Sequence, residues 1–134
     1  MVFTMHILFV THFLPPVGDN ANTGGTISNR HLLRHLSREG NVSVLSLDRR
    51  HVNNSAYKDE PFNVFNFPAP KWSTLKKPFY WSQCVQLSVD AFTAKQGAPN
   101  VIIATTDTLP ALEKVPSEAS RVAVVRAFEN FGFF

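Results

Sequence analysis

Short apolar runs alternate with longer amphipathic segments along this chain of 134 residues. Five runs have the length of strands, and they cover residues 5–10, 41–47, 62–67, 100–106 and 121–128. The first run is apolar except for His6, which is typical of a strand buried on both faces. The second and third runs alternate apolar and polar positions, which also favours strands. The pattern therefore predicts five strands separated by helices or connections.

The first helical segment is predicted over residues 26–39. One side of this helix carries Gly25, Asn29, Leu32, Leu36 and, beside them, Leu33. The arginines of the segment, Arg30, Arg34 and Arg38, are expected on its other sides. Gly40 follows the segment and is predicted to cap the C-terminus of the helix.

A second helix is predicted over residues 79–95, and Gly97 ends it. Its apolar side carries Trp81, Val85, Val89 and Phe92 at helical spacing. Residues 48–61 have little periodicity and are expected to form a polar connection. Residues 107–120 are expected to form a short helical or irregular connection between the last two strands.

This order of elements predicts an α/β fold, with a doubly wound parallel sheet between helices in three layers, α/β/α. No repeat, low-complexity tract or linker divides the sequence, so residues 1–134 are expected to form one domain. No covering helix follows the last predicted strand. We therefore expect a fragment or the first half of a longer protein, although a stand-alone domain could cover the bare strand by dimerising.

Composition narrows the class of protein. Hydrophobic residues make up 44% of the chain and charged residues 17%, as in a globular protein. The net charge of +3 is too small to indicate a nucleic-acid partner. The single cysteine, Cys84, cannot form an internal disulfide, and no apolar stretch has the length of a membrane span. With no recognisable signal peptide, the expected location is the cytoplasm.

The connection before the first helix, from His12 to Gly25, contains two prolines and paired glycines. In open α/β sheets the first strand-to-helix loop is the usual phosphate site, because N–H groups at the helix start attract anions. Gly24, Gly25 and Thr26 stand at that place. The alternative is that the glycines serve only the turn and the packing. Neither a G-x-G-x-x-G motif nor a P-loop motif occurs here.

The stretch "MHILFVTHFLPPVGDNANTGGTISNRHLLRHLSREGNVSVLSL" resembles the N-terminal domain of GT-B glycosyltransferases of the family-4 type. That domain opens with a strand like "ILFV", followed by "PP", a spacer, "GG", a helix and a strand. The later "PNVIIATTDTLPAL" is similar to the fourth strand and following loop of the family. The likeness is specific in the first 47 residues and loose over 48–97, and the spacer "VGDNAN" is longer than in the tightest members.

The resemblance implies one half of a GT-B architecture, in which two Rossmann-like domains face each other across a cleft. The N-terminal domain holds a glycan or lipid-linked acceptor, and the C-terminal domain holds the nucleotide sugar. Gly24 and Gly25 would then lie near the donor diphosphate. The donor-binding domain, with its paired glutamates, is absent from the 134 residues, so this chain alone is expected to be inactive. The nucleotide sugar is a substrate, and no cofactor is expected.

Four further residues are candidates for the same site. Asp107 follows the fourth strand, and Arg126 and Glu129 stand at the end of the fifth. A carboxylate in a cleft could orient or deprotonate an acceptor hydroxyl, which makes Asp107 and Glu129 the catalytic candidates. The alternatives are a turn cap for Asp107 and a solvated side chain for Glu129. His12 could contact a phosphate or a sugar, or have a structural role.

Two other patterns bear on metal binding and on membrane contact. His31 and His35 lie one helical turn apart, but no third ligand accompanies them, so no metal site is expected. Basic and aromatic residues gather in one segment: Lys71, Trp72, Lys76, Lys77, Phe79, Tyr80 and Trp81. This segment predicts a weak peripheral contact with the inner face of an anionic membrane. The alternative is aromatic packing flanked by solvated lysines.

The leading hypothesis is the acceptor-binding domain of a nucleotide-sugar-dependent glycosyltransferase of the hexosyltransferase type, in glycan or polysaccharide biosynthesis. The second hypothesis is a non-catalytic Rossmann-like module that binds a ligand or regulates a partner.

Overall fold

The computed structural model describes residues 4–20, 22–48, 54–67, 78–114 and 118–124. Its strands are β1 (Met5–Thr11), β2 (Gly40–Ser46), β3 (Asn63–Asn66), β4 (Val101–Thr105) and β5 (Ser120–Val124). Its helices are α1 (Gly24–Leu36) and α3 (Pro78–Gln96), with the 3-10 helices η1 (Asn54–Tyr57) and η2 (Thr106–Glu113). The five predicted strands and the two predicted helices are confirmed.

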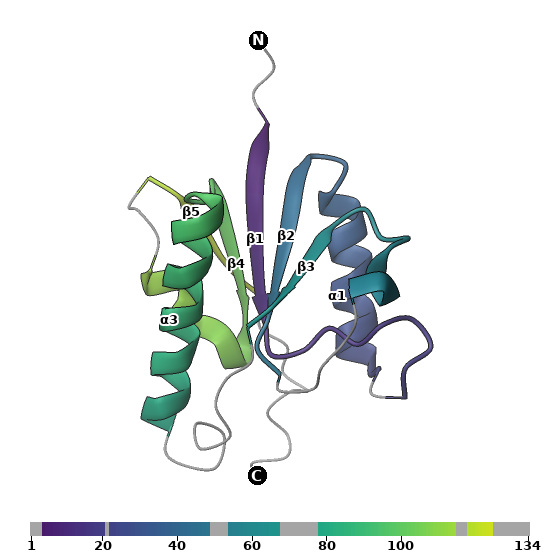
Figure 1. The fold of residues 1–134 in the computed structure, drawn as a ribbon, viewed down its shortest axis with the longest axis horizontal. Coiled ribbons are helices and arrows are strands. Elements are labelled where there is room, and N and C mark those ends of the chain that lie inside the picture. Colours follow the sequence, from purple (N-terminus) through teal and green to yellow (C-terminus); the bar gives the residue numbers. More distant parts are fainter. Residues whose placement is uncertain (1–3, 21, 49–53, 68–77, 115–117, 125–134) are drawn as a thin grey trace.

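The strands form one parallel sheet in the order β3-β2-β1-β4-β5. β1 lies at its centre (Figure 1) and pairs with β2 from Met5 opposite Gly40 to Thr11 opposite Ser46. On its other side β1 pairs with β4, with Ile7 opposite Val101. The chain therefore runs outward from β1 to β3 and crosses back to β4. This order confirms a Rossmann-like α/β fold.

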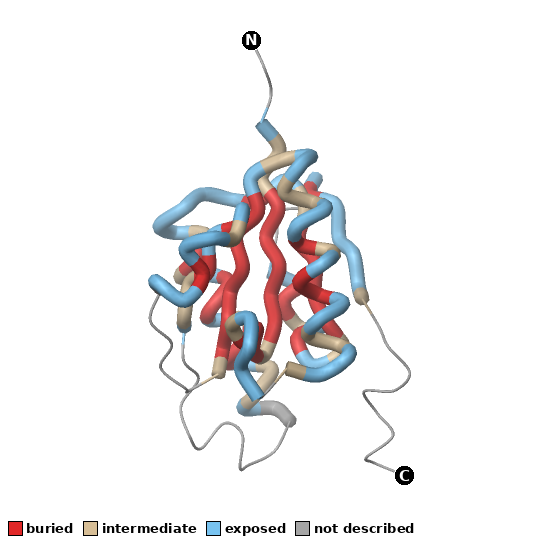
Figure 2. Tube along the Cα trace, turned by 90° about the vertical axis from the view of Figure 1, so that its right-hand side faces the viewer, coloured by how far each residue is buried: buried red, intermediate tan, exposed pale blue. Residues whose placement is uncertain are grey.

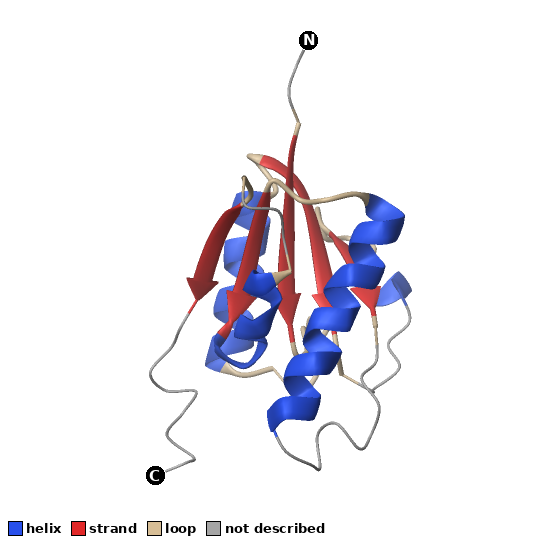
Figure 3. Ribbon diagram, turned by 90° about the vertical axis from the view of Figure 1, so that its left-hand side faces the viewer, coloured by secondary structure: helices blue, strands red, loops and turns tan. Residues whose placement is uncertain are grey.

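Both faces of the sheet are covered. Successive side chains of a strand point to opposite faces, so Phe9 packs with Leu33 of α1, whereas Leu8 and Val10 pack with Val89 of α3. Figure 3 shows α3 and η2 in front of the sheet and α1 behind it. Buried residues follow the central strands, and exposed residues lie on the outer sides of the helices (Figure 2). This double burial explains the unbroken apolar run in β1.

One expectation about α1 is wrong. Gly40 does not cap the helix, because Ser37 is the C-cap and Gly40 is the first residue of β2. A Cβ at Gly40 would collide with the backbone carbonyl oxygen of Met5 in β1, so glycine is required there by the neighbouring strand. Arg30 is expected away from the apolar side of α1, and its burial is not predicted. It is buried, because its charge is paired with Glu60.

The fifth strand lies at the edge of the sheet. Its sequence resembles a buried strand, but the described residues of β5 are exposed or half-buried. The reason is its place in the sheet, since among the described strands β5 lies at the edge and pairs with β4 alone. A strand with one neighbour is covered less than the central β1.

Candidate functional site

The candidate site lies at the carboxyl edge of the sheet, where all the strand arrows end (Figure 3). From β1 the chain continues to α1 on one face, and β4, reached through α3 on the other face, lies beside β1. In open α/β sheets ligands bind outside such a change of direction. His12 follows β1, Asp48 follows β2 by two residues, and Asp107 lies in η2 directly after β4.

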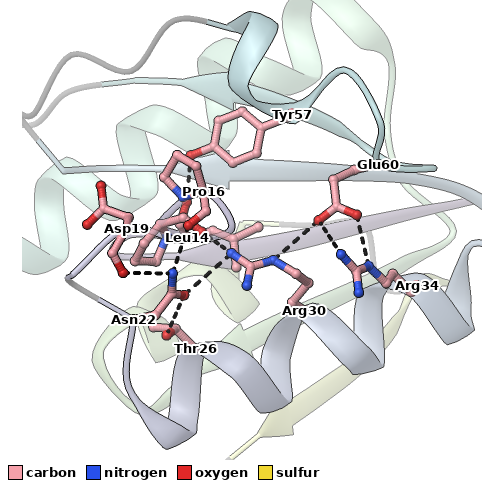
Figure 4. Close-up of polar contacts among 10 residues, drawn as sticks. Leu14, Pro16, Asp19, Asn22, Thr26, Arg30, Arg34, Tyr57 and Glu60 are labelled. Atoms are coloured by element: carbon pink, nitrogen blue, oxygen red, sulfur yellow. Dashed lines mark hydrogen bonds and ion pairs between the residues drawn. The ribbon is translucent and has the colours of Figure 1, made fainter.

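The loop between β1 and α1 is held by side chains from other elements (Figure 4). The hydroxyl of Tyr57 donates a hydrogen bond of 2.5 Å to the carbonyl oxygen of Leu14. The guanidinium of Arg30 donates to the carbonyl oxygen of Pro15. These bonds satisfy two loop carbonyls that face the protein body. The loop is therefore fixed to α1 and to the η1 segment.

Within the loop, Asn22 acts as a cross-link between its two ends. Its Nδ2 atom donates to the carbonyl oxygens of Pro16, at 2.7 Å, and of Asp19, at 3.2 Å. Its Oδ1 atom accepts from the hydroxyl of Thr26, at 3.1 Å, and from Arg30 Nη2, at 3.4 Å. One amide thus joins the proline turn to the first turn of α1, as Figure 4 shows.

Arg30 is compensated by a carboxylate that the sequence analysis did not identify. Its Nε atom lies 3.2 Å from Glu60 Oε2, and both side chains are 7% exposed. Glu60 also accepts two hydrogen bonds from Arg34, at 2.8 Å from Nε and 3.1 Å from Nη2. The Arg34 side chain is 42% exposed, so only one of the two arginines is buried.

Tyr57 reaches the loop as a neutral donor. Burial raises the pKa of Tyr57 to about 12, while the nearby Arg30 guanidinium opposes this rise and Asp19 adds to it. The phenol therefore keeps its proton at neutral pH, and its hydroxyl remains able to donate to Leu14.

The first turn of α1 begins at a capping box. The amide of Thr23 donates to the Thr26 hydroxyl oxygen at 2.8 Å, and the amide of Thr26 donates to the Thr23 hydroxyl oxygen at 3.3 Å. This cap explains why α1 begins at Gly24, two residues before the predicted start. A Cβ at Gly24 would have no atom within 4 Å, so the fold does not need glycine there. Gly24 is exposed at a helix start that favours anions.

A second group of side chains lies where β1 and β2 end. The Nε2 atom of His12 lies 3.4 Å from Asp48 Oδ2. The His12 ring packs edge to face with Trp81 of α3, with ring centroids 5.3 Å apart. The Trp81 Nε1 atom donates a hydrogen bond of 2.6 Å to the backbone carbonyl oxygen of Asp107. The Asp107 residue is exposed, and its Oδ1 atom accepts from the Thr105 hydroxyl at 3.4 Å.

The structure thus divides the sequence-predicted residues into two groups. His12 and Asp107 are joined through Trp81, and the neighbours Gly24, Gly25 and Thr26 form the start of α1. No hydrogen bond or ion pair among the described residues connects His12 with this helix start.

Some of the predicted site residues and membrane-contact residues lie outside the part of the chain that the structure describes. Arg126 and Glu129 lie outside the described residues, and so do Lys71, Lys76 and Lys77 of the basic aromatic segment. Trp81 belongs to that segment, but it packs against the core on the α3 face of the sheet.

Asp48, Glu60 and Tyr57 are residues that sequence reasoning missed. Asp48 could have been found, because it follows a predicted strand at the same edge as His12. Glu60 and Tyr57 lie in a connection without periodicity, and nothing in that pattern indicates that they reach the first loop.

The described residues contain no group of three or more His, Cys, Asp or Glu side chains that could hold a metal ion. A helix long and apolar enough to cross a membrane is likewise not found in the described part of the chain. Compared with known proteins, the chain matches no protein-family model and no curated protein.

Proposed function

We propose that this chain is the acceptor-side domain of a nucleotide-sugar-dependent glycosyltransferase of the GT-B type. The observation that carries the proposal is the start of α1. This helix begins with the exposed Gly24, at the carboxyl edge of a Rossmann-like sheet. The Asn22 hydrogen bonds hold the preceding loop against the first turn of the helix. The sequence resemblance supplies the family, and the fold agrees with it.

In this proposal these residues position the donor diphosphate and take no covalent part in the reaction. Unpaired N–H groups and the helix dipole at Gly24 and Gly25 would face the diphosphate of a donor held by a second domain, outside the 134 residues. Because no Cβ stands at Gly24, a phosphate oxygen can approach the backbone closely. Transfer then depends on orientation and on stabilisation of the leaving diphosphate, without a nucleophile from this domain.

The exposed carboxylate of Asp107 is the described candidate for orienting an acceptor hydroxyl. Glu129 and Arg126 keep their proposed places beside the acceptor on the strength of the sequence alone. His12 joins this group from the end of β1. In this proposal the acceptor is a glycan or a lipid-linked glycan.

A peripheral membrane contact belongs to the same proposal. Phe67 and Tyr80, which flank residues 68–77, are 39% and 37% exposed. The three lysines of that segment would add about 1 kcal/mol each at an anionic surface. We expect this chain to sediment weakly with vesicles that contain phosphatidylserine and to be released by salt. Equal sedimentation with neutral vesicles would contradict the contact.

The test of the transferase proposal is calorimetry with a panel of nucleotide sugars on the complete gene product and on this chain. We expect the complete protein to bind and turn over a donor and this chain to bind it weakly or not at all. Gly24→Ala fits the fold without a collision, so it should preserve stability yet weaken donor binding. Ser28→Ala, at an exposed position of the same helix, is the matched control.

Tight nucleotide binding by this chain alone would place the donor site within these residues and refute the two-domain assignment. A complete protein that binds no nucleotide sugar would favour the non-catalytic module.

A further inference from the structure

The side chains of His12, Asp48 and Trp81 differ in charge from the start of α1. The side chain of His12 is 44% exposed, whereas that of Asp48 is 13% exposed. Asp107, whose backbone carbonyl accepts from Trp81 Nε1, carries a second, exposed carboxylate. The Asp48 carboxylate, 3.4 Å from the imidazole, disfavours an incoming phosphate, so this part of the edge favours a neutral polar ligand.

The contact with Asp48 also determines what His12 can offer. A carboxylate accepts hydrogen bonds, so its place beside Nε2 favours the ring form with the hydrogen on that atom. The other ring nitrogen, Nδ1, then carries a lone pair. Among the described residues His12 has no side-chain partner besides Asp48 and the Trp81 ring. Nδ1 is therefore an acceptor for a donor from outside the protein.

Trp81 adds an apolar surface next to this acceptor. Its indole is held by the bond to the Asp107 carbonyl and by packing against the core. A fixed aromatic side chain beside a few polar groups is the usual composition of a small-molecule site. Sugars combine apolar C–H faces with hydroxyl donors and match this composition.

We propose that His12, Asp48 and Trp81 form a sugar-binding subsite at the carboxyl edge, distinct from the α1 start. His12 Nδ1 accepts a hydrogen bond from a sugar hydroxyl, and Asp48 is the positioning residue that fixes the ring form of His12. The subsite deepens the proposed function, on which it rests for naming an acceptor sugar as the occupant.

The role of Asp48 is tested by ¹⁵N NMR of the imidazole nitrogens in this chain. We expect the His12 hydrogen on Nε2 in the wild type and a mixed population in Asp48→Ala. Asp90→Ala is the control, because Asp90 pairs with Lys114 on the outer surface of the molecule. Its His12 signals should match the wild type. Amide spectra confirm that each variant is folded, and an unchanged His12 ring form in folded Asp48→Ala would refute the positioning role.

The ligand class is tested by titration with methyl α-glucoside, methyl α-mannoside and inorganic phosphate. Trp72→Phe leaves a single indole signal, that of Trp81. We expect at least one glycoside, but not phosphate, to shift the His12 ring and Trp81 indole signals saturably. Asp48→Ala should weaken this binding about 3- to 10-fold, the loss of one hydrogen bond. Signals unmoved by either glycoside, or moved by phosphate instead, would overturn the subsite.

This outcome is separable from the transferase proposal. If the complete protein turns over a nucleotide sugar while neither glycoside reaches His12, the subsite is wrong and the proposed function stands. If a glycoside binds at His12 but the complete protein binds no nucleotide sugar, the transferase proposal fails and the subsite remains.

Discussion

Gly24 and Gly40 lie at the start of consecutive elements but are subject to opposite constraints. Gly40 opens β2 against the backbone of Met5, and any side chain there meets a carbonyl that cannot move without disturbing the sheet. Gly24 opens α1 with free space around it. Packing therefore explains one glycine and leaves the other open to a role in binding.

We expect Gly40→Ala to lower the free energy of unfolding by about 1–3 kcal/mol, because β1 and β2 must move apart locally. Gly24→Ala should leave that free energy unchanged or slightly higher, because alanine favours helix over glycine. Urea unfolding followed by circular dichroism measures both. Equal stability of the two variants would contradict the close approach at Met5.

The raised pKa of Tyr57 predicts a loss of stability at alkaline pH. Its folded pKa of about 12 lies above the ordinary tyrosine value of about 10, so the folded protein holds this proton more tightly than the unfolded chain. The stabilisation is complete below pH 10 and is lost as the pH rises from 10 to 12. Urea midpoints measured across this range should fall.

Tyr57→Phe is the matched variant for that measurement. At neutral pH it should lose about 1–2 kcal/mol, because the Leu14 carbonyl loses its donor. Above pH 10 its stability should fall less steeply than that of the wild type. Parallel curves would show that the alkaline loss comes from other groups.

At the scale of elements, α1 and the loop before it behave as one unit. Asn22 and Arg30 tie the loop to the helix, and Glu60 ties the helix to the segment before β3. The direction in which α1 presents its first turn therefore depends on a carboxylate far along the chain.

Removing that carboxylate should loosen the unit. Glu60→Gln leaves the buried Arg30 without its counter-charge, and we expect a loss of about 3 kcal/mol or more in the free energy of unfolding. Arg34→Gln, at the exposed end of the same cluster, should cost about 1 kcal/mol or less. Thermal unfolding of the two variants tests this order, and the reverse order would contradict the burial of Arg30.

The sequence predicted the elements better than it predicted their contacts. Apolar or alternating runs indicate all five strands, and the unbroken apolar run of β1 reflects its place at the centre of a parallel sheet, covered on both faces. The first turn of α1 is missed because Gly24 and Gly25 resemble a loop. The burial of Arg30 is missed because helical periodicity ignores distant partners. His12 was found from its place after a strand. Its pairing with Asp48 depends on strand order, which local pattern does not contain.

At the scale of the whole molecule, β1 is the strand that both halves of the sheet share. It is buried on both faces and paired on both edges. Among the described strands, β5 is paired with β4 alone, and its residues are exposed or half-buried. Stability should therefore decrease from the centre of the sheet toward β5.

Hydrogen exchange measures this gradient directly. We expect the amides of β1 and β4 to exchange only through global unfolding, and those of β5 to exchange at least about 10-fold faster through local opening. Equal protection in β1 and β5 would show that the edge strand is covered in solution.

The pairing of β1 with β4 has a consequence for synthesis. At the amino ends of these strands the backbone amide of His6 donates a hydrogen bond to the side-chain oxygen of Asn100, across a separation of 94 residues. At the usual rate of translation, roughly 5 to 20 seconds pass between the appearance of the two partners at the ribosome. During that interval β1 can pair with β2, but the backbone N–H and C=O groups on its other edge have no strand partner. A chaperone that shields nascent chains would therefore bind first to β1, near the N-terminus of this protein.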